Sequence, residues 1–146
     1  MNLHRLLQER EAASRPVRVV LVGAGKFGSM YLSQARRTPG IHLLAVADLA
    51  PERARASLLR TGWSESMLGA ASLDAAMKDR TTFLTDDAAT AIAHPATEVV
   101  IDATGSPAAG IRHVLACCAA GKHIVMVNVE ADALAGPILA RMARQA

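Results

Sequence analysis

V-R-V-V-L-V-G-A-G-K-F-G, residues 17 to 28, is the stretch that decides the fold of this chain. Five of its first six residues are Val or Leu, which predicts a parallel strand buried on both faces over Val17 to Val22. The glycines that follow are spaced G-x-G-x-x-G, and apolar residues then recur at helical spacing through Phe27, Met30, Tyr31 and Ala35. A strand, a tight turn and a helix in this order predict the first unit of a dinucleotide-binding fold.

Each glycine of the turn has its own expected role. Gly23 lets the chain turn sharply out of the strand, and Gly25 lets a pyrophosphate approach the backbone without a Cβ in the way. Gly28 lets the helix pack close to the strand, and the unpaired N–H groups at the start of the helix face the phosphates. The full turn, including Ala24, Lys26 and Phe27, is therefore our candidate phosphate-binding segment.

A second apolar run, Ile41 to Ala47, predicts the next strand, and Asp48 follows it, 20 residues after Gly28. A carboxylate there can accept hydrogen bonds from both hydroxyls of the adenosine ribose and would repel a 2′-phosphate, which favours NAD. Arg53 and Arg55 on the following helix could reach a 2′-phosphate, so NADP stays open. A methyltransferase is a minor alternative, although Val22 stands where that class usually has an acid before its first glycine.

Length and composition fit one compact domain, because the 146 residues are 51% hydrophobic and 20% charged. We expect a helical extension over residues 1–15 and a dinucleotide-binding domain over residues 16–146. The net charge of +3 is spread along the chain and aromatic residues make up only 3%, which argues against nucleic acid as a partner. No continuous apolar stretch predicts a signal peptide or membrane span, so we expect a cytoplasmic protein with no membrane partner.

Later segments continue the alternation of strands and helices. Further strands are predicted over residues 81–84, 98–103 and 122–127, which gives an α/β fold with a Rossmann-type doubly wound parallel sheet of about five strands. The turn after the fourth strand carries Thr104 and Gly105, which should line the nicotinamide side of the cofactor. We find no sixth strand, and an exposed sheet edge favours a homodimer.

Four segments resemble the nucleotide-binding domain of homoserine dehydrogenase-like oxidoreductases. They are V-G-A-G-K-F-G-S-M at 22–30, A-D-L-A-P-E-R-A-R-A at 47–56, D-A-T-G-S-P-A-A-G at 102–110 and A-G-K-H-I-V-M-V-N-V-E-A-D at 120–132. The sequence is most similar to the branch that carries a C-terminal SAF domain and includes deoxyxylulose-phosphate reductoisomerase-like enzymes. The G-K-H segment is shared, more loosely, with sugar dehydrogenases of the glucose-fructose oxidoreductase type.

The resemblance implies hydride transfer with NAD or NADP in an enzyme of several domains, and reductoisomerase-like relatives would be expected to use NADPH. No substrate domain follows the predicted last helix, Pro137 to Gln145, so we expect a fragment or a degenerate gene product that binds a small-molecule substrate only with a catalytic domain. The families place a lysine after the fifth strand, where this chain has Val127-Asn128-Val129-Glu130. Asn128 and Glu130 are the candidate catalytic residues, and Glu130 is equally well explained as a helix-start carboxylate.

No histidine is assigned to catalysis, and no pair of ligand residues has metal-binding spacing. Three classes of function follow from the sequence. The first is the cofactor-binding part of an NAD(P)-dependent oxidoreductase. The second is a non-enzymatic sensor that binds a dinucleotide and reports redox state through a partner. The third is a structural remnant that binds no nucleotide.

Overall fold

A computed structural model describes all of residues 1–146. Five strands and seven α-helices alternate along the chain, with one short 3₁₀ helix, η1, between α3 and α4. The elements in order are α1 (Leu3–Ala12), β1 (Val17–Val22), α2 (Lys26–Ala35), β2 (Ile41–Ala47), α3 (Pro51–Arg60), η1 (Glu65–Met67), α4 (Leu73–Asp79), β3 (Phe83–Thr85), α5 (Ala88–Ala93), β4 (Val99–Asp102), α6 (Pro107–Ala120), β5 (His123–Met126) and α7 (Val129–Gln145).

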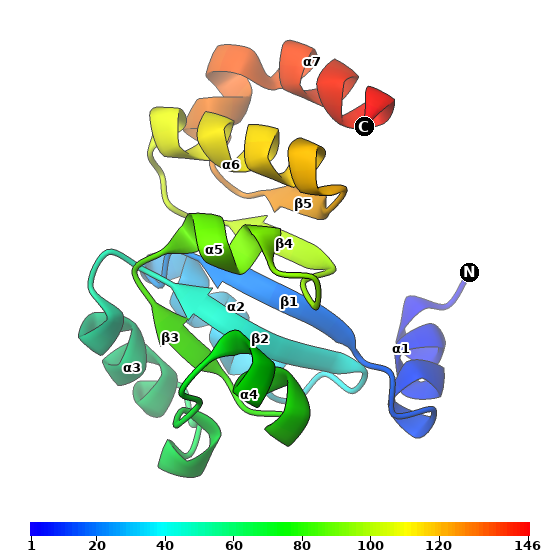
Figure 1. Cartoon of the computed structure of the whole chain (residues 1–146), viewed down its shortest axis with the longest axis vertical. Helices are drawn as coiled ribbons and strands as arrows, with labels where there is room; N and C mark the ends of the chain where they lie inside the picture. The colour runs from blue at the N-terminus through cyan, green and yellow to red at the C-terminus, as the bar shows by residue number, and fades with distance from the viewer.

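All strand pairs in the sheet are parallel, and the strand order is β3-β2-β1-β4-β5. The order reverses at β1, because the chain moves outward through β2 and β3 and then returns to the other side of β1 with β4. Helices α4, α5 and α6 cover one face of the sheet, and α2 and α3 lie behind it (Figure 1). The predicted doubly wound α/β fold with five strands is confirmed.

The core forms one cluster on each face of the sheet, because successive side chains of a strand point to opposite faces. Within β1, Val20 and Val22 belong to the cluster that contains Ala76, Ile92 and Cys117 from the helices α4, α5 and α6. The neighbouring β1 residues Val19 and Leu21 belong to the second cluster, with Leu32, Ala54 and Leu58 from α2 and α3 as the helical contribution. The sheet is therefore covered on both faces around β1, as a buried parallel strand requires.

The strands predicted over residues 98–103 and 122–127 are each one residue shorter at both ends, at Val99–Asp102 and His123–Met126. Two other predicted boundaries differ by more. The third strand begins at Phe83 and not at Thr81, because its pairing with β2 starts only where Phe83 lies opposite Ala45. Thr82 is used differently: its N–H donates to the Met67 carbonyl and its hydroxyl to the Leu43 carbonyl.

The last helix begins at Val129, not at Pro137. Asn128 caps it by accepting a hydrogen bond from the Ala131 N–H, so the first two turns form ahead of the proline. Pro137 lies inside α7 on its solvent-exposed side. Proline has no N–H to donate within the helix, and water can bond the backbone carbonyl that is left without a donor at this exposed position.

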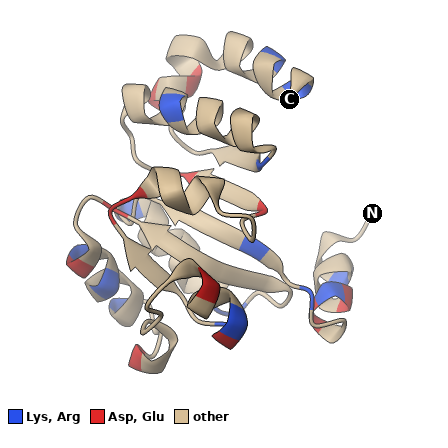
Figure 2. Ribbon diagram, viewed as in Figure 1, with Lys and Arg blue, Asp and Glu red and all other residues tan.

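Charged side chains of both signs are distributed over the helices (Figure 2). Arginine or lysine occurs on every α-helix except α5, and no single element collects them. The chain has no helix with both the length and the apolar character needed to cross a membrane.

Candidate dinucleotide-binding site

A cleft of about 380 Å³ opens at the carboxyl ends of β1, β2 and β4, where the strand order reverses. Ligands of doubly wound sheets bind at this position. The turns that follow these strands form much of the lining, and residues from the starts of α3 and α5 and from the first two turns of α6 complete it. The lining residues are Val22, Gly23, Ala47, Asp48, Leu49, Arg53, Asp86, Ala88, Thr104, Ser106, Ala109, Arg112 and His113.

The glycine turn at the edge of this cleft is closely packed at one glycine and open at another. A Cβ on Gly28 would collide with the Gly23 carbonyl oxygen, which explains why the start of α2 can approach the end of β1. A Cβ on Gly25 would meet nothing within 4 Å. Gly25 also begins α2 without a side-chain cap, so the first N–H groups of the helix are free to bind an anion in that space.

Asp48 is buried beside this turn and connects it to α3. Its Oδ2 accepts a hydrogen bond of 2.9 Å from the Ala24 N–H. Its Oδ1 accepts from the Ala50 N–H and from Nη2 of Arg53, also at 2.9 Å. The side chain of Asp48 is 6% exposed, whereas that of Arg53 is 69% exposed. The carboxylate therefore fixes the glycine turn, and the guanidinium covers it on the solvent side.

Burial alone would raise the pKa of Asp48, but hydrogen bonds from Ala24, Ala50 and Arg53 outweigh it and lower the pKa below its usual value. Asp48 is thus a carboxylate at neutral pH. Three of the roughly four acceptor positions of a carboxylate are taken. One acceptor position is left for a ligand, and a second becomes available only when Arg53 moves.

Asp102 ends β4 with its side chain fully buried in a polar network. Its Oδ1 accepts from the N–H and the hydroxyl of Thr104, at 3.0 and 2.9 Å, and its Oδ2 lies 2.5 Å from Nδ1 of His113. Burial would raise the pKa of Asp102, but the bonds from His113 and Thr104 lower it overall. Thr104, a predicted cofactor contact, is thereby held at the rim of the cleft.

Asn128 is 1% exposed and joins this network to α7. Its Nδ2 donates to the Ser106 carbonyl at 2.7 Å and to the Thr104 hydroxyl at 3.1 Å, while its Oδ1 accepts from the Ala131 N–H. The contacts show Asn128 positioning the turn after β4. Glu130 is exposed in the first turn of α7, away from this network. A catalytic role for Asn128 or Glu130 stays a prediction.

Sequence reasoning did not select Arg112 and His113, which both line the cleft. A signal for His113 was available: it lies with Gly110, Val114 and Cys117 on the inward face of α6, at spacings of three and four residues. A polar side chain on such a face needs a partner, and Asp102 at the end of the preceding strand is the one it has. No group of three or more His, Cys, Asp or Glu side chains is arranged to hold a metal ion.

Comparison with protein families gives one match that covers almost the whole chain. Residues 5–145 match the model of the homoserine dehydrogenase NAD-binding domain. The chain belongs to this family. The resemblance that was read from the four sequence segments is thereby confirmed at the level of the family, while the narrower likeness to the SAF-domain branch stays a prediction. A search of curated protein sequences finds no match.

Solved structures of oxidoreductases share this fold. An NAD-binding oxidoreductase from Klebsiella pneumoniae superposes with a TM-score of 0.64 at 18% identity, over 89% of this chain and 32% of its own. The myo-inositol dehydrogenase from Lactobacillus casei, in complex with NAD(H) and myo-inositol, gives a TM-score of 0.56 at 18% identity, over 76% of this chain and 28% of its own. A levoglucosan dehydrogenase in complex with NADH and L-sorbose gives 0.54 at 23% identity, over 76% and 27%.

These identities support a shared fold and no more. The chain spans about a third of the length of the structures it matches.

Proposed function

We propose that this chain binds a nicotinamide dinucleotide in the carboxyl-end cleft and is the cofactor-binding part of an oxidoreductase that acts on a small polar metabolite. The observation that carries the proposal is the glycine turn. The turn has free space beside Gly25, is tightly packed at Gly28, and is held by the hydrogen bond from the Ala24 N–H to Asp48. The family match and the dinucleotides bound in two of the similar structures support the same ligand.

In this arrangement the pyrophosphate lies on the first N–H groups of α2, above Gly25. The adenosine ribose meets Asp48, and Thr104 lies beside the nicotinamide half. Gly105, the other predicted contact in that turn, is not among the residues that line the cleft. The bound nicotinamide supplies the hydride chemistry. The residues of the chain bind the cofactor and orient it.

NAD is the preferred cofactor in this proposal, because the Asp48 carboxylate repels a 2′-phosphate. Arg53 is the residue that opposes this preference. Its guanidinium lies on the solvent side of Asp48, where the 2′ position of the ribose would come. The balance between NAD and NADP therefore depends on whether Arg53 stays on Asp48 or turns to the cofactor.

Calorimetric titration of residues 1–146 with NADH, NADPH and S-adenosylmethionine tests the proposal. We expect NADH to bind most tightly and S-adenosylmethionine not to bind. Failure of both dinucleotides to bind would refute the proposal, and preference for S-adenosylmethionine would point to a methyltransferase.

Two variants locate the ribose. Asp48→Ala should weaken the binding of NADH about tenfold or more, because it removes a charge-assisted hydrogen bond, and it should weaken the binding of NADPH by less. Since this variant also removes the bond to Ala24, Arg53→Gln provides the matched test: it leaves the carboxylate in place, so NADH binding should be retained while NADPH binding falls. Equal losses for both cofactors in both variants would show that this pair does not face the ribose.

Hydride transfer itself is a proposal about the whole protein, since the structures that this chain resembles are about three times longer. Residues 1–146 should bind cofactor without oxidising sugars or polyols. Steady turnover of such a substrate by this chain would contradict that expectation.

A further inference from the structure

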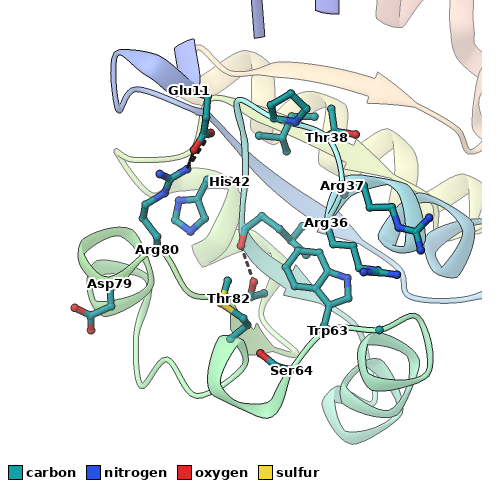
Figure 3. Close-up of a pocket in the computed structure, with 16 residues that line it drawn as sticks. Glu11, Arg36, Arg37, Thr38, His42, Trp63, Ser64, Asp79, Arg80 and Thr82 are labelled. Atoms are coloured by element: carbon teal, nitrogen blue, oxygen red, sulfur yellow. Dashed lines mark hydrogen bonds and ion pairs between the residues drawn. The ribbon is translucent and has the colours of Figure 1, made fainter. Parts of the chain in front are cut away.

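A second and larger cavity, of about 740 Å³, lies at the opposite end of the sheet (Figure 3). We call it the amino-end cavity, because the first residues of β2, Ile41 to Leu43, form part of its wall. The length of β2 separates it from the dinucleotide cleft, roughly 20 Å for a strand of this size. The remaining wall comes from the end of α2, the segment before and within η1, and the end of α4. The remaining lining residues are Glu11, Ala35, Arg36, Arg37, Thr38, Pro39, Gly62, Trp63, Ser64, Met67, Asp79, Arg80 and Thr82.

One wall of the amino-end cavity carries a fixed indole ring and a fixed guanidinium. Nε1 of Trp63 donates to the Leu32 carbonyl at 3.0 Å, which holds the ring against the core. Nε of Arg36 donates to the Thr61 carbonyl at 2.8 Å. A Cβ on Gly62 would lie 2.9 Å from Cζ of Arg36, so the guanidinium lies directly against a backbone that has no side chain there.

The terminal nitrogens of Arg36 have no protein partner, since only its Nε makes a hydrogen bond. Figure 3 shows the guanidinium beside the Trp63 ring at the cavity. A planar cation with free N–H groups next to an aromatic face can hold a carboxylate and the flat body attached to it at the same time.

The facing wall is electrically balanced. Nη2 of Arg80 donates to both carboxylate oxygens of Glu11, at 3.0 and 3.1 Å, and the Gly40 N–H donates to the same carboxylate. His42 lies beside this pair with Nε2 2.8 Å from the Thr81 carbonyl, and burial lowers its pKa, so it is neutral at pH 7. Arg36, Arg37 and Asp79 also line the cavity without an ion-pair partner, and Arg36 is the one of the three that a hydrogen bond fixes beside Trp63.

These contacts select among anions. The cavity lies at the carbonyl end of α2, where the helix dipole disfavours anions, and a multiply charged phosphate most of all. A single negative charge suits the one guanidinium that is fixed beside Trp63. Ile41, Leu43 and Met67 supply apolar surface for the rest of the ligand.

We propose that the amino-end cavity is a second ligand site, which binds a small carboxylate with a flat apolar or aromatic body: Arg36 takes the carboxylate and Trp63 stacks on the body. The site is separate from the dinucleotide cleft, so its occupant is a second small molecule that the protein binds independently of the cofactor. This proposal goes beyond the cofactor role and does not rest on it.

Trp63 is the only tryptophan of the chain, so its fluorescence reports directly on the cavity. We would titrate residues 1–146 with benzoate and follow the emission of Trp63, with benzyl alcohol as the uncharged probe. We expect a saturable change with benzoate at millimolar concentrations, the range open to a ligand of this size, and a weak unsaturated response to benzyl alcohol. No saturable response to benzoate up to about 20 mM would overturn the proposal.

The adjacent arginines provide a matched pair of variants. Arg36→Gln should weaken benzoate about tenfold, because it removes a charge-assisted hydrogen bond, whereas Arg37→Gln should change the affinity by less than about twofold. Equal effects of the two variants, or no effect of Arg36→Gln, would overturn the assignment. Thermal unfolding of each variant shows that it is folded, and the indole N–H signal of Trp63 in an NMR spectrum gives a second measure of binding in both.

NADH should bind equally well with and without benzoate. A failed benzoate titration would therefore leave the dinucleotide proposal intact, and a failed NADH titration would leave this one intact.

Discussion

The two ends of the sheet differ in how their polar groups are used. At the carboxyl end, Asp48, Asp102 and Asn128 are buried and have hydrogen-bond partners within the chain. At the amino end, Arg36 has free donors beside a larger cavity. The carboxyl end uses its side chains chiefly to shape backbone turns, and it offers a ligand the N–H groups of the glycine turn and the one free acceptor position of Asp48. The amino end offers side chains directly.

This difference predicts how each end should tolerate substitution. Removing a buried side chain at the carboxyl end leaves its partners unsatisfied, so stability and binding should fall together. Removing an exposed side chain at the amino end should affect binding alone. The four predictions below test this contrast, beginning with the largest expected effect.

Asp102→Ala should lower the free energy of unfolding by about 3 kcal/mol or more, because it leaves His113 and the Thr104 N–H without their acceptor inside the protein. Chemical denaturation measures the change. Asp79→Ala, an exposed acid at the amino end, is the control and should leave stability unchanged. The contrast fails if the two variants unfold at the same denaturant concentration.

Gly28→Ala should cost about 1–3 kcal/mol, because its Cβ collides with the Gly23 carbonyl and forces α2 away from β1. Gly25→Ala has open space around its Cβ, so it should lose less stability and still lose NADH binding. Thermal unfolding and NADH titration of both variants separate the two roles. A Gly25→Ala protein with unchanged NADH affinity would contradict the placement of the pyrophosphate.

Tyr31→Phe should stabilise the protein by about 1 kcal/mol, because the Tyr31 hydroxyl is buried without a hydrogen-bond partner. Burial also raises the pKa of Tyr31 to about 12 from an ordinary value of 10.0. The folded state therefore keeps the Tyr31 proton to higher pH than the unfolded state does, and ionisation of Tyr31 favours unfolding. The wild-type protein loses no stability to this ionisation below pH 10.0 and loses it progressively as the pH rises towards about 12.

Burial raises the pKa of Cys117 to about 12 as well, so the measurement for Tyr31 is the difference between wild type and Tyr31→Phe. Denaturation midpoints of the two proteins should diverge between pH 10 and about 12. Parallel curves over that range would rule out a buried hydroxyl at residue 31.

His42 should give the smallest effect, confined to acidic pH. Burial lowers its pKa from 6.5, so the unfolded state takes up a proton before the folded state does. Its contribution to stability is complete above pH 6.5 and is lost as the pH falls through the lowered value. The pH dependence of unfolding should be shallower in His42→Gln than in wild type and unchanged in the control His123→Gln, whose ring is exposed.

Much of the fold could be predicted because its signals are local. The strands Val17–Val22 and Ile41–Ala47 have the predicted boundaries, since an apolar run and the turn residues that end it act within a few residues. The sequence predicts the start of the last helix at Pro137, because proline is favoured at the first position of a helix, whereas Asn128 caps α7 two turns earlier.

The candidate site could be predicted only in part. The glycine turn and Asp48 are found by spacing, because the strand and helix between them have nearly fixed lengths. The bond from Arg53 to Asp48 and the contact of His113 with Asp102 depend on rotamers and on the packing of α3 and α6 against the sheet. The amino-end cavity joins residues from Glu11 to Thr82, and no local pattern brings them together.

The position of β1 also constrains the order in which the chain folds. Val19 pairs with Leu43, close by in the sequence, and with Val99, much farther along. Closing the longer loop costs more entropy, so we expect β1 and β2 to associate first and β4 to dock last. Pulse-labelled hydrogen exchange would contradict this if Val99 and Val100 were protected before Leu43. Because Thr104 and Asp102 reach the glycine turn only with β4, the dinucleotide cleft is completed in the final step of folding.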